Sequence, residues 1–206
     1  MKTRKATKGI EIGSSMRLSD MSDEALVEKT LEGSDAAFGE LTKRYMQKSY
    51  SIAFQMVGDF ETAQDLSQDV FLKIYKSLHK FNFKSKFFSW FYKILMNHCI
   101  NYTRRRKALK FLAFSEIFQS SNNALDKNDI LKYSDEETTE KQRMVRMAVD
   151  QLSPNHKQVI VMCDLEGFPQ EEVADILGMA IGTVRSRLHY ARGNLKKILK
   201  KYLNEI

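Results

Sequence analysis

The stretch QEEVADILGMAIGTVRSRLHYAR, residues 170–192, decides the fold. It begins with a short helical pattern, QEEVADIL, passes through the turn GMA, and continues as a second helix from about Gly182. Ala174 is small where two helices must approach closely, and Gly178 can adopt the positive φ that a tight turn needs. Val184 then faces back toward the first helix. This spacing is typical of a helix-turn-helix.

The outward face of the second helix carries polar side chains when it is projected at about 100° per residue. Arginine can bond guanine, and serine or threonine can reach a base or a phosphate. A plain helical hairpin with a basic surface is the alternative, but it does not require this spacing of small and apolar residues. The candidates for contact with duplex DNA are Thr183, Arg185, Ser186, His189 and Tyr190, with Arg187, Arg192, Lys196 and Lys197 as phosphate contacts.

The rest of the chain is also helical in pattern. Only 2 prolines and 9 glycines interrupt it, and apolar residues recur with a period near 3.6. Ser22 is a candidate N-cap for a first helix that stops at Gly33. Ser153, followed by Pro154, is the same signal for a later helix that ends at Gly167. We therefore expect an all-α protein.

The charge pattern divides the chain into segments. Between residues 108 and 142 acidic residues outnumber basic ones, and the runs SSNN and KNDILKYSDEETTE are typical of a polar linker. We expect two small helical domains, an N-terminal bundle and a C-terminal helix-turn-helix domain, joined by a flexible acidic linker. The expected boundaries are 1–20 for a disordered basic tail, 21–107, 108–140 for the linker and 141–206, with translation starting at Met1, Met16 or Met21.

The overall charge indicates an anionic partner. The chain of 206 residues carries a formal charge of +7 and has a pI near 9.3, which favours nucleic acid, although a solvated basic surface is the alternative. Cys99 and Cys163 match neither a disulfide framework nor a metal site, and the histidines form no ligand cluster. We expect a cytoplasmic protein without cofactor or metal, and the apolar runs are too short for insertion into a membrane.

An acid-free belt runs from Val70 to Ser115. It contains no Asp or Glu but holds 12 of the 22 aromatic residues of the chain, together with eleven lysines and arginines. Cations neutralise phosphates, and aromatic faces stack on bases only where those bases are unpaired. The belt therefore predicts a surface for single-stranded or opened nucleic acid, and its lack of carboxylates argues against a nuclease or other metal enzyme.

The rings of the belt divide by position. Phe87, Phe91 and Ile94 have the spacing of a helix that faces a core. Phe81 and Phe83 precede that helix in a loop with the pattern Asn-x-Lys-Ser, where packing explains rings less easily. Contact with bases and core packing are both open for these two rings and for Trp90, whose N–H can stay in water while its ring packs.

Four motifs in order resemble the sigma factors of bacterial RNA polymerase of the extracytoplasmic-function (ECF) type. LVEKTLEGSDAAFGELTKRY looks like the first conserved region, and AQDLSQDVFLKIYKSL is similar to the segment that docks on polymerase. FFSWFYKILMNHCINYTRRRK looks like the helix that melts promoters and reads the −10 element, and EGFPQEEVADILGMAIGTVRSRLHYAR resembles the −35 reader. This chain departs from the family at two positions. The family often has Arg where this chain has Tyr190, and it commonly has Ser or Thr where this chain has Pro169.

The resemblance implies partners and roles. Asp65, Gln68, Asp69 and Phe71 would bind the clamp helices of the polymerase β′ subunit, and the C-terminal domain would meet the β flap. Residues 81–86 would capture a flipped base of the −10 element, with Asn97 in support. The other partners would be double- and single-stranded promoter DNA and an anti-sigma factor. The full set implied for the −10 element is Phe81, Phe83, Lys84, Lys86, Trp90, Asn97, Arg104 and Arg105.

Function is then expected to be that of an initiation factor rather than an enzyme. Such a factor binds core polymerase, recognises −35 and −10 elements and promotes strand opening. The alternative is a helix-turn-helix regulator that acts without polymerase docking. That alternative leaves the acid-free belt unexplained.

Overall fold

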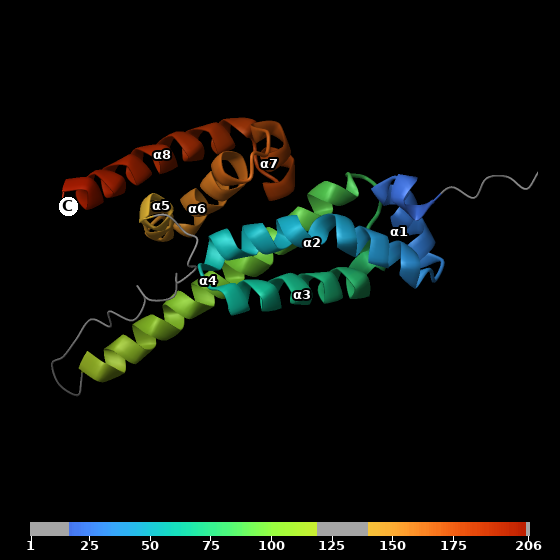
Figure 1. The fold of residues 1–206 in the computed structure, drawn as a ribbon, viewed down its shortest axis with the longest axis horizontal. Helices are drawn as coiled ribbons and strands as arrows, with labels where there is room; N and C mark the ends of the chain where they lie inside the picture. The colour runs from blue at the N-terminus through green and yellow to red at the C-terminus, as the bar shows by residue number, and fades with distance from the viewer. Residues whose placement is uncertain (1–16, 119–139, 205–206) are drawn as a thin grey trace, which may run out of the picture.

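The computed structural model describes residues 17–118 and 140–204, and all its regular elements in these ranges are helical (Figure 1). This confirms the all-α expectation. Four helices form a first module: α1 (Asp23–Leu31), α2 (Asp35–Val57), α3 (Phe60–Ser77) and α4 (Phe87–Phe118). The second module consists of α5 (Glu140–Asp150), α6 (Pro154–Ile160), a π-helical continuation η4 (Val161–Leu165), α7 (Gln170–Leu177) and α8 (Ile181–Asn204).

The helix boundaries follow the capping signals in the sequence. Ser22 accepts a hydrogen bond from the Ala25 N–H, and Gly33 follows α1 with φ of +100°. Ser153 caps α6, with Pro154 at its first position. The α6–η4 segment ends before Gly167, which has φ of +73°, so these expected starts and stops are confirmed.

The N-terminal boundary differs from the expectation. Residues Leu18–Asp20 form a 3₁₀ turn, η1, and are not part of a disordered tail. The Arg44 guanidinium fixes this turn by donating from Nη2 to the carbonyls of Leu18 (3.2 Å) and Ser19 (3.0 Å). The rest of the expected tail, including Met16, lies outside the described residues.

Helix α4 also runs further than expected. The run of basic residues ending at Lys107 indicated its end, but the helix continues to Phe118. Residues 108–118 contain neither proline nor glycine, and Ala and Leu favour the helix there, so nothing in them stops it. The remainder of the expected linker, up to residue 139, lies outside the described residues.

The first module packs around rings of α4. Phe87 and Phe91 are 1% exposed and pack against Tyr45 of α2 at ring-centroid distances of 5.6 and 4.6 Å. These two rings are core residues as expected, whereas Ile94 is only partly buried. Leu95, with no exposed surface, takes the place expected for Ile94.

The two modules share one core at the N-terminal half of α4, where α7 lies against it (Figure 1). Phe168, 8% exposed, contacts the rings of Phe88 (5.5 Å) and Tyr92 (5.2 Å). Lys48 of α2 lies 4.4 Å from the Phe168 ring centre and donates to the Glu166 carbonyl at 2.7 Å. Ser51 donates to the Glu166 carboxylate at 2.5 Å. We call Glu166 and Phe168, with these partners, the intermodule contact.

Candidate nucleic-acid interface

A short loop, residues 82–86, joins the end of the α3–η2 segment to α4, where η2 is the 3₁₀ turn Leu78–Lys80. All five loop residues are exposed, while the residues on either side, Phe81 and Phe87, are 4% and 1% exposed. The Phe81 and Phe87 rings meet edge to face at 5.8 Å. The loop is therefore held at both ends by buried rings, and its middle is free to contact a ligand.

Backbone geometry turns the side chain of Phe83 outward. Its φ is +57°, a left-handed conformation that costs an aromatic residue free energy, and its side chain is 44% exposed. The Asn82 side chain accepts a hydrogen bond from the Lys84 N–H at 3.2 Å, closing the turn that the sequence indicated. Lys84 and Lys86 of the same loop are also exposed, so the loop offers an exposed ring together with two cations.

Phe81 packs in the core, which is one of the two positions that the sequence left open for it. The turn η2 follows α3 and directs the Phe81 ring inward. There it contacts the rings of Phe83 and Trp90, at centroid distances of 4.8 and 5.4 Å. Of the two alternatives, the structure places Phe81 in the core, and Phe83 is the ring that solvent reaches. Trp90 is partly buried against Phe81 and Phe87.

The rest of α4 extends the basic surface. Asn97, Arg104 and Arg105, which the resemblance assigned to the −10 element, are all exposed. Arg106 instead turns inward and donates to the Val57 carbonyl at 3.4 Å. The sequence-predicted −10 set is therefore brought to one module, with Phe81 as its buried member.

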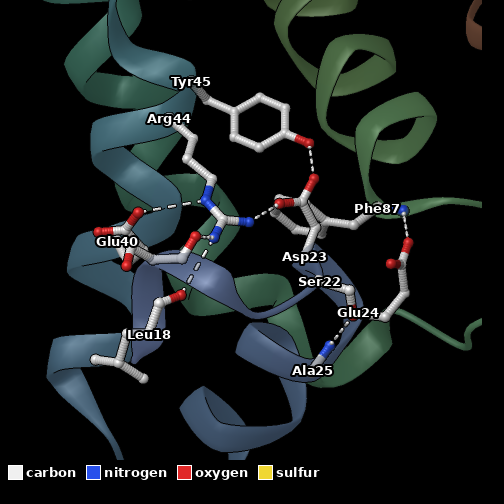
Figure 2. Close-up of polar contacts among 10 residues, drawn as sticks. Leu18, Ser22, Asp23, Glu24, Ala25, Glu40, Arg44, Tyr45 and Phe87 are labelled. Atoms are coloured by element: carbon white, nitrogen blue, oxygen red, sulfur yellow. Dashed lines mark hydrogen bonds and ion pairs between the residues drawn. The ribbon is translucent and has the colours of Figure 1, made fainter. Parts of the chain in front are cut away.

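A polar network links α1 to both α2 and α4 (Figure 2). Asp23 accepts hydrogen bonds from Arg44, at 2.7 Å, and from the Tyr45 hydroxyl. Burial, with Asp23 beside the hydroxyl, holds the pKa of Tyr45 far above its ordinary value, so the phenol keeps its proton. The next residue, Glu24, accepts from the backbone N–H of Phe87 at 3.0 Å. No pattern in the sequence pointed to this network.

The second module contains the expected helix-turn-helix. Helix α7 ends at Gly178, whose φ is +63°, and α8 begins at Ile181. Val184 and Leu188, 0% and 2% exposed, bury the inner face of α8. Pro169 precedes α7 without a capping side-chain bond. The expected outward residues Arg185, Ser186, His189 and Tyr190 are exposed, and Thr183 is half-buried.

The arginines of α8 differ in how firmly other side chains hold them. Arg192 makes a two-pronged ion pair with Asp164, at 2.9 and 2.6 Å, and Asp164 raises the pKa of Arg192. The half-buried Arg187 lies 3.6 Å from the sulfur of Met179. Arg185 makes a long contact with Glu171, 3.6 Å between two exposed side chains. Arg185 is therefore held less firmly than Arg192.

The exposed face of α3 matches the expected docking segment in part. Asp65, Gln68 and Asp69 are exposed, but Phe71 is 8% exposed and packs on Phe91 at 5.2 Å. Phe71 therefore belongs to the core, since its helical position faces α4 and not solvent. Leu72, 59% exposed, lies on the face of Asp65 and Asp69 and was missed by the sequence analysis.

Other kinds of site find little support in the part of the chain that the structure describes. No group of three or more His, Cys, Asp or Glu side chains among residues 17–118 and 140–204 could hold a metal ion. No helix in those ranges has both the length and the apolar character to cross a membrane. Burial raises the pKa of the Cys99 thiol to about 12, so this thiol is not a nucleophile at neutral pH.

Together these features define a class of protein: a two-module helical DNA-binding protein with a helix-turn-helix on one module and an aromatic, cationic loop on the other. Comparison with models of known protein families narrows this class. The model of sigma-70 region 2 matches residues 41–109, and that of sigma-70 region 4 matches residues 142–195.

Individual relatives agree with these matches. The ECF RNA polymerase sigma-E factor of Haemophilus influenzae is 31% identical over 84% of this chain and 92% of its own length. The ECF sigma factor SigE of Mycolicibacterium smegmatis is 30% identical over 82% of this chain, which spans 64% of that relative. A chain in a solved structure of CnrH in complex with the cytosolic domain of CnrY has a TM-score of 0.61 and 25% identity, and the match covers 87% of this chain and 97% of that one.

The chain belongs to the ECF family of RNA polymerase sigma factors. It is a transcription initiation factor that directs RNA polymerase to promoters, and it is not an enzyme. The resemblance seen in the sequence is thereby confirmed. A regulator that acts without polymerase is set aside, because the region 2 match covers the module that such a regulator would not need.

Proposed function

We propose that this sigma factor divides promoter recognition between its two modules. Helix α8 reads the −35 element as a duplex, with Arg185 and Ser186 at base edges and Lys196 and Lys197 on phosphates. The first module reads the −10 element after its strands separate, with Phe83 stacking on an unpaired base and Lys84 and Lys86 on the backbone. The observation that carries the proposal is the exposed loop 82–86, held between two buried rings.

Strand opening then follows from binding alone. Stacking of a captured base is worth about 1–3 kcal/mol, which is comparable to the few kcal/mol needed to unpair it. The acid-free belt supports this role because no carboxylate between residues 70 and 115 repels the displaced strand. Asn97, Arg104 and Arg105 extend the same cationic surface along α4.

Docking on polymerase is assigned to the exposed face of α3. Asp65, Gln68 and Asp69 supply polar contacts to the β′ clamp helices, and Leu72 supplies an apolar one that replaces the buried Phe71. An apolar side chain rimmed by carboxylates is typical of a site for another protein. The second module would meet the β flap.

In vitro transcription with core polymerase tests this division. Genomic DNA bound by the reconstituted holoenzyme is sequenced, and promoters found there are then used as templates. Permanganate reactivity of −10 thymines should appear only with both core polymerase and this chain. Absence of any promoter-dependent transcript, or opening by the chain alone, would refute the proposal.

A regulatory protein partner is a second proposal, supported by the structural relative that was solved with the CnrY cytosolic domain. Such a protein would act as an anti-sigma factor if it covers the α3 face. The measurement is competition: a protein recovered with the tagged chain should displace core polymerase, and Leu72→Asp should weaken both complexes. Binding that leaves polymerase in place would contradict an anti-sigma role.

A further inference from the structure

The N-terminus of α4 is capped by a residue from another helix. The Phe87 N–H donates to Glu24 Oε1 of α1 at 3.0 Å, across 63 positions in the chain (Figure 2). The residue at the N-cap position itself is Lys86, because its carbonyl accepts from the Trp90 N–H at 3.2 Å. A lysine side chain has no acceptor, so Lys86 cannot satisfy the first N–H groups of its own helix. Glu24 takes over that function.

Glu24 is itself held in a fixed place. Leu26 and Val27 have no exposed surface and bury the same turn of α1 in the core. The neighbouring Asp23 is tied to α2 through Arg44 and the Tyr45 hydroxyl, and Ser22 caps α1. The carboxylate that reaches α4 therefore starts from a rigid backbone. Its position fixes where the loop 82–86 joins α4.

Charge strengthens the contact. A carboxylate is stabilised near the positive end of a helix, and here Lys84 and Lys86 add positive charge nearby. The belt from Val70 to Ser115 contains no acid of its own. The compensating charge at this end of α4 thus comes from Glu24 of α1.

We propose that Glu24 is a positioning residue for base capture: it fixes the start of α4 and thereby the orientation in which Phe83 meets an unpaired −10 base. Glu24 does not touch DNA in this assignment. It acts through the Phe87 N–H, and its effect should be confined to promoter opening. The inference rests on the proposed role of the loop 82–86.

The experiment compares three substitutions in the full chain assembled with core polymerase. Glu24→Ala removes the acceptor, and Glu24→Asp keeps the charge but withdraws it by one methylene. Glu24→Gln keeps an oxygen acceptor at the original reach. A helix cap is worth about a five-fold change in an equilibrium, and this sets the upper bound on its effect on opening. Glu24→Ala and Glu24→Asp should therefore lower permanganate reactivity of the −10 region by up to about five-fold. Glu24→Gln should retain most of it.

The matched control is Glu28→Ala, one turn further along α1, where the side chain is exposed. It removes an acid of the same type from the same helix and should leave opening unchanged. Polymerase affinity and binding to a −35 duplex should be unaffected by any of these changes. Trp90, the only tryptophan of the chain, packs on Phe81 and Phe87, so acrylamide quenching of its fluorescence should increase in Glu24→Ala and Glu24→Asp.

A double-mutant cycle with Phe83→Ala separates positioning from general destabilisation. If Glu24 acts through the loop, Glu24→Ala should cost little more once Phe83 is gone. Fully additive losses, or a loss in Glu24→Gln equal to that in Glu24→Ala, would overturn the inference. If Glu24→Ala fails to fold, the contrast between Asp and Gln at this position decides. If Phe83→Ala itself leaves opening unchanged, the proposed function of the loop fails first.

Discussion

In the function proposed above, the loop 82–86 and the helix-turn-helix present side chains to DNA in opposite ways. In the helix-turn-helix the contacting groups project from one face of α8, whose inner face is buried through Val184 and Leu188. In the loop the contacting ring, Phe83, stands outside any helix and adopts a left-handed conformation. A duplex offers base edges in a groove, which a rigid helix can follow, whereas an unpaired base offers its face, which only a projecting ring can meet.

The largest expected effect separates the two rings of the loop. Phe81→Ala removes a ring that is 4% exposed and should lower the free energy of unfolding by about 3–5 kcal/mol. Phe83→Ala removes a ring that is 44% exposed and makes one contact with Phe81, so it should change that free energy by no more than about 1 kcal/mol. Denaturant unfolding of the full chain measures both. Equal destabilisation would mean that Phe83 also belongs to the core.

The next effect concerns opening. Phe83→Ala should weaken formation of the open complex by about 2 kcal/mol, or about thirty-fold, because one stacked base is lost. Binding of the closed complex should hardly change, since duplex DNA offers no face to the ring. Permanganate footprinting and duplex binding, measured on the same promoter, give the two numbers. Equal losses in both would erase the distinction between the loop and the helix-turn-helix.

A somewhat smaller effect is expected on the duplex side. Arg185→Ala should reduce discrimination at one −35 position by about 1–2 kcal/mol, in the lower part of the range for an arginine–guanine pair. The reduction is moderate because Arg185 must first leave Glu171, 3.6 Å away. Selection from randomised −35 sequences measures this discrimination. Ser186→Ala, which removes the other proposed base contact, is compared in the same selection. An unchanged preference would remove Arg185 from the reading set.

The turn of the helix-turn-helix should be less sensitive. Gly178→Ala places a side chain at φ of +63° and should cost about 1 kcal/mol of stability through backbone strain. An added Cβ would lie 3.4 Å from Lys93 Nζ of α4, the end of a flexible side chain, so crowding adds little. Thermal unfolding checks this. A loss of unfolding free energy larger than the about 3–5 kcal/mol expected for Phe81→Ala would show that the turn controls the intermodule contact.

The smallest effect is on salt dependence. Lys196→Ala should lower the slope of log affinity against log salt by about 0.9 without changing sequence preference, because one phosphate contact is lost. Arg192→Ala should lower the slope less, since Asp164 already neutralises that guanidinium. Fluorescence anisotropy across a salt series compares the two. A larger change for Arg192 would show that its ion pair opens on DNA.

Local signals in the sequence predicted most of the fold. Ser22, Gly33, Ser153 and Gly178 act on their own helix ends, so their effect can be recognised without knowing any partner. The helix-turn-helix was predictable for the same reason. Helix α4 was cut short in the prediction because a charge run was interpreted as a stop, although charged residues are good helix formers.

The site was less predictable because it depends on which way a side chain turns at a helix end. Phe71 was assigned to a surface, and Phe81 was left open between base contact and core packing, but each ring faces the core once α3 packs on α4. Leu72 was overlooked since an exposed leucine has no distinguishing pattern in a sequence. The Glu24–Phe87 hydrogen bond joins residues 63 positions apart, and no periodicity relates them.

The intermodule contact limits how this molecule can be re-engineered. Phe168 belongs to the second module, but its ring is enclosed by Phe88 and Tyr92 of the first, with Lys48 over its face. A chimera whose −35 reader carries a different residue at this position would place that residue in the enclosure. Such a chimera of this protein is expected to need matching changes at Lys48, Phe88 and Tyr92, or a phenylalanine restored at position 168.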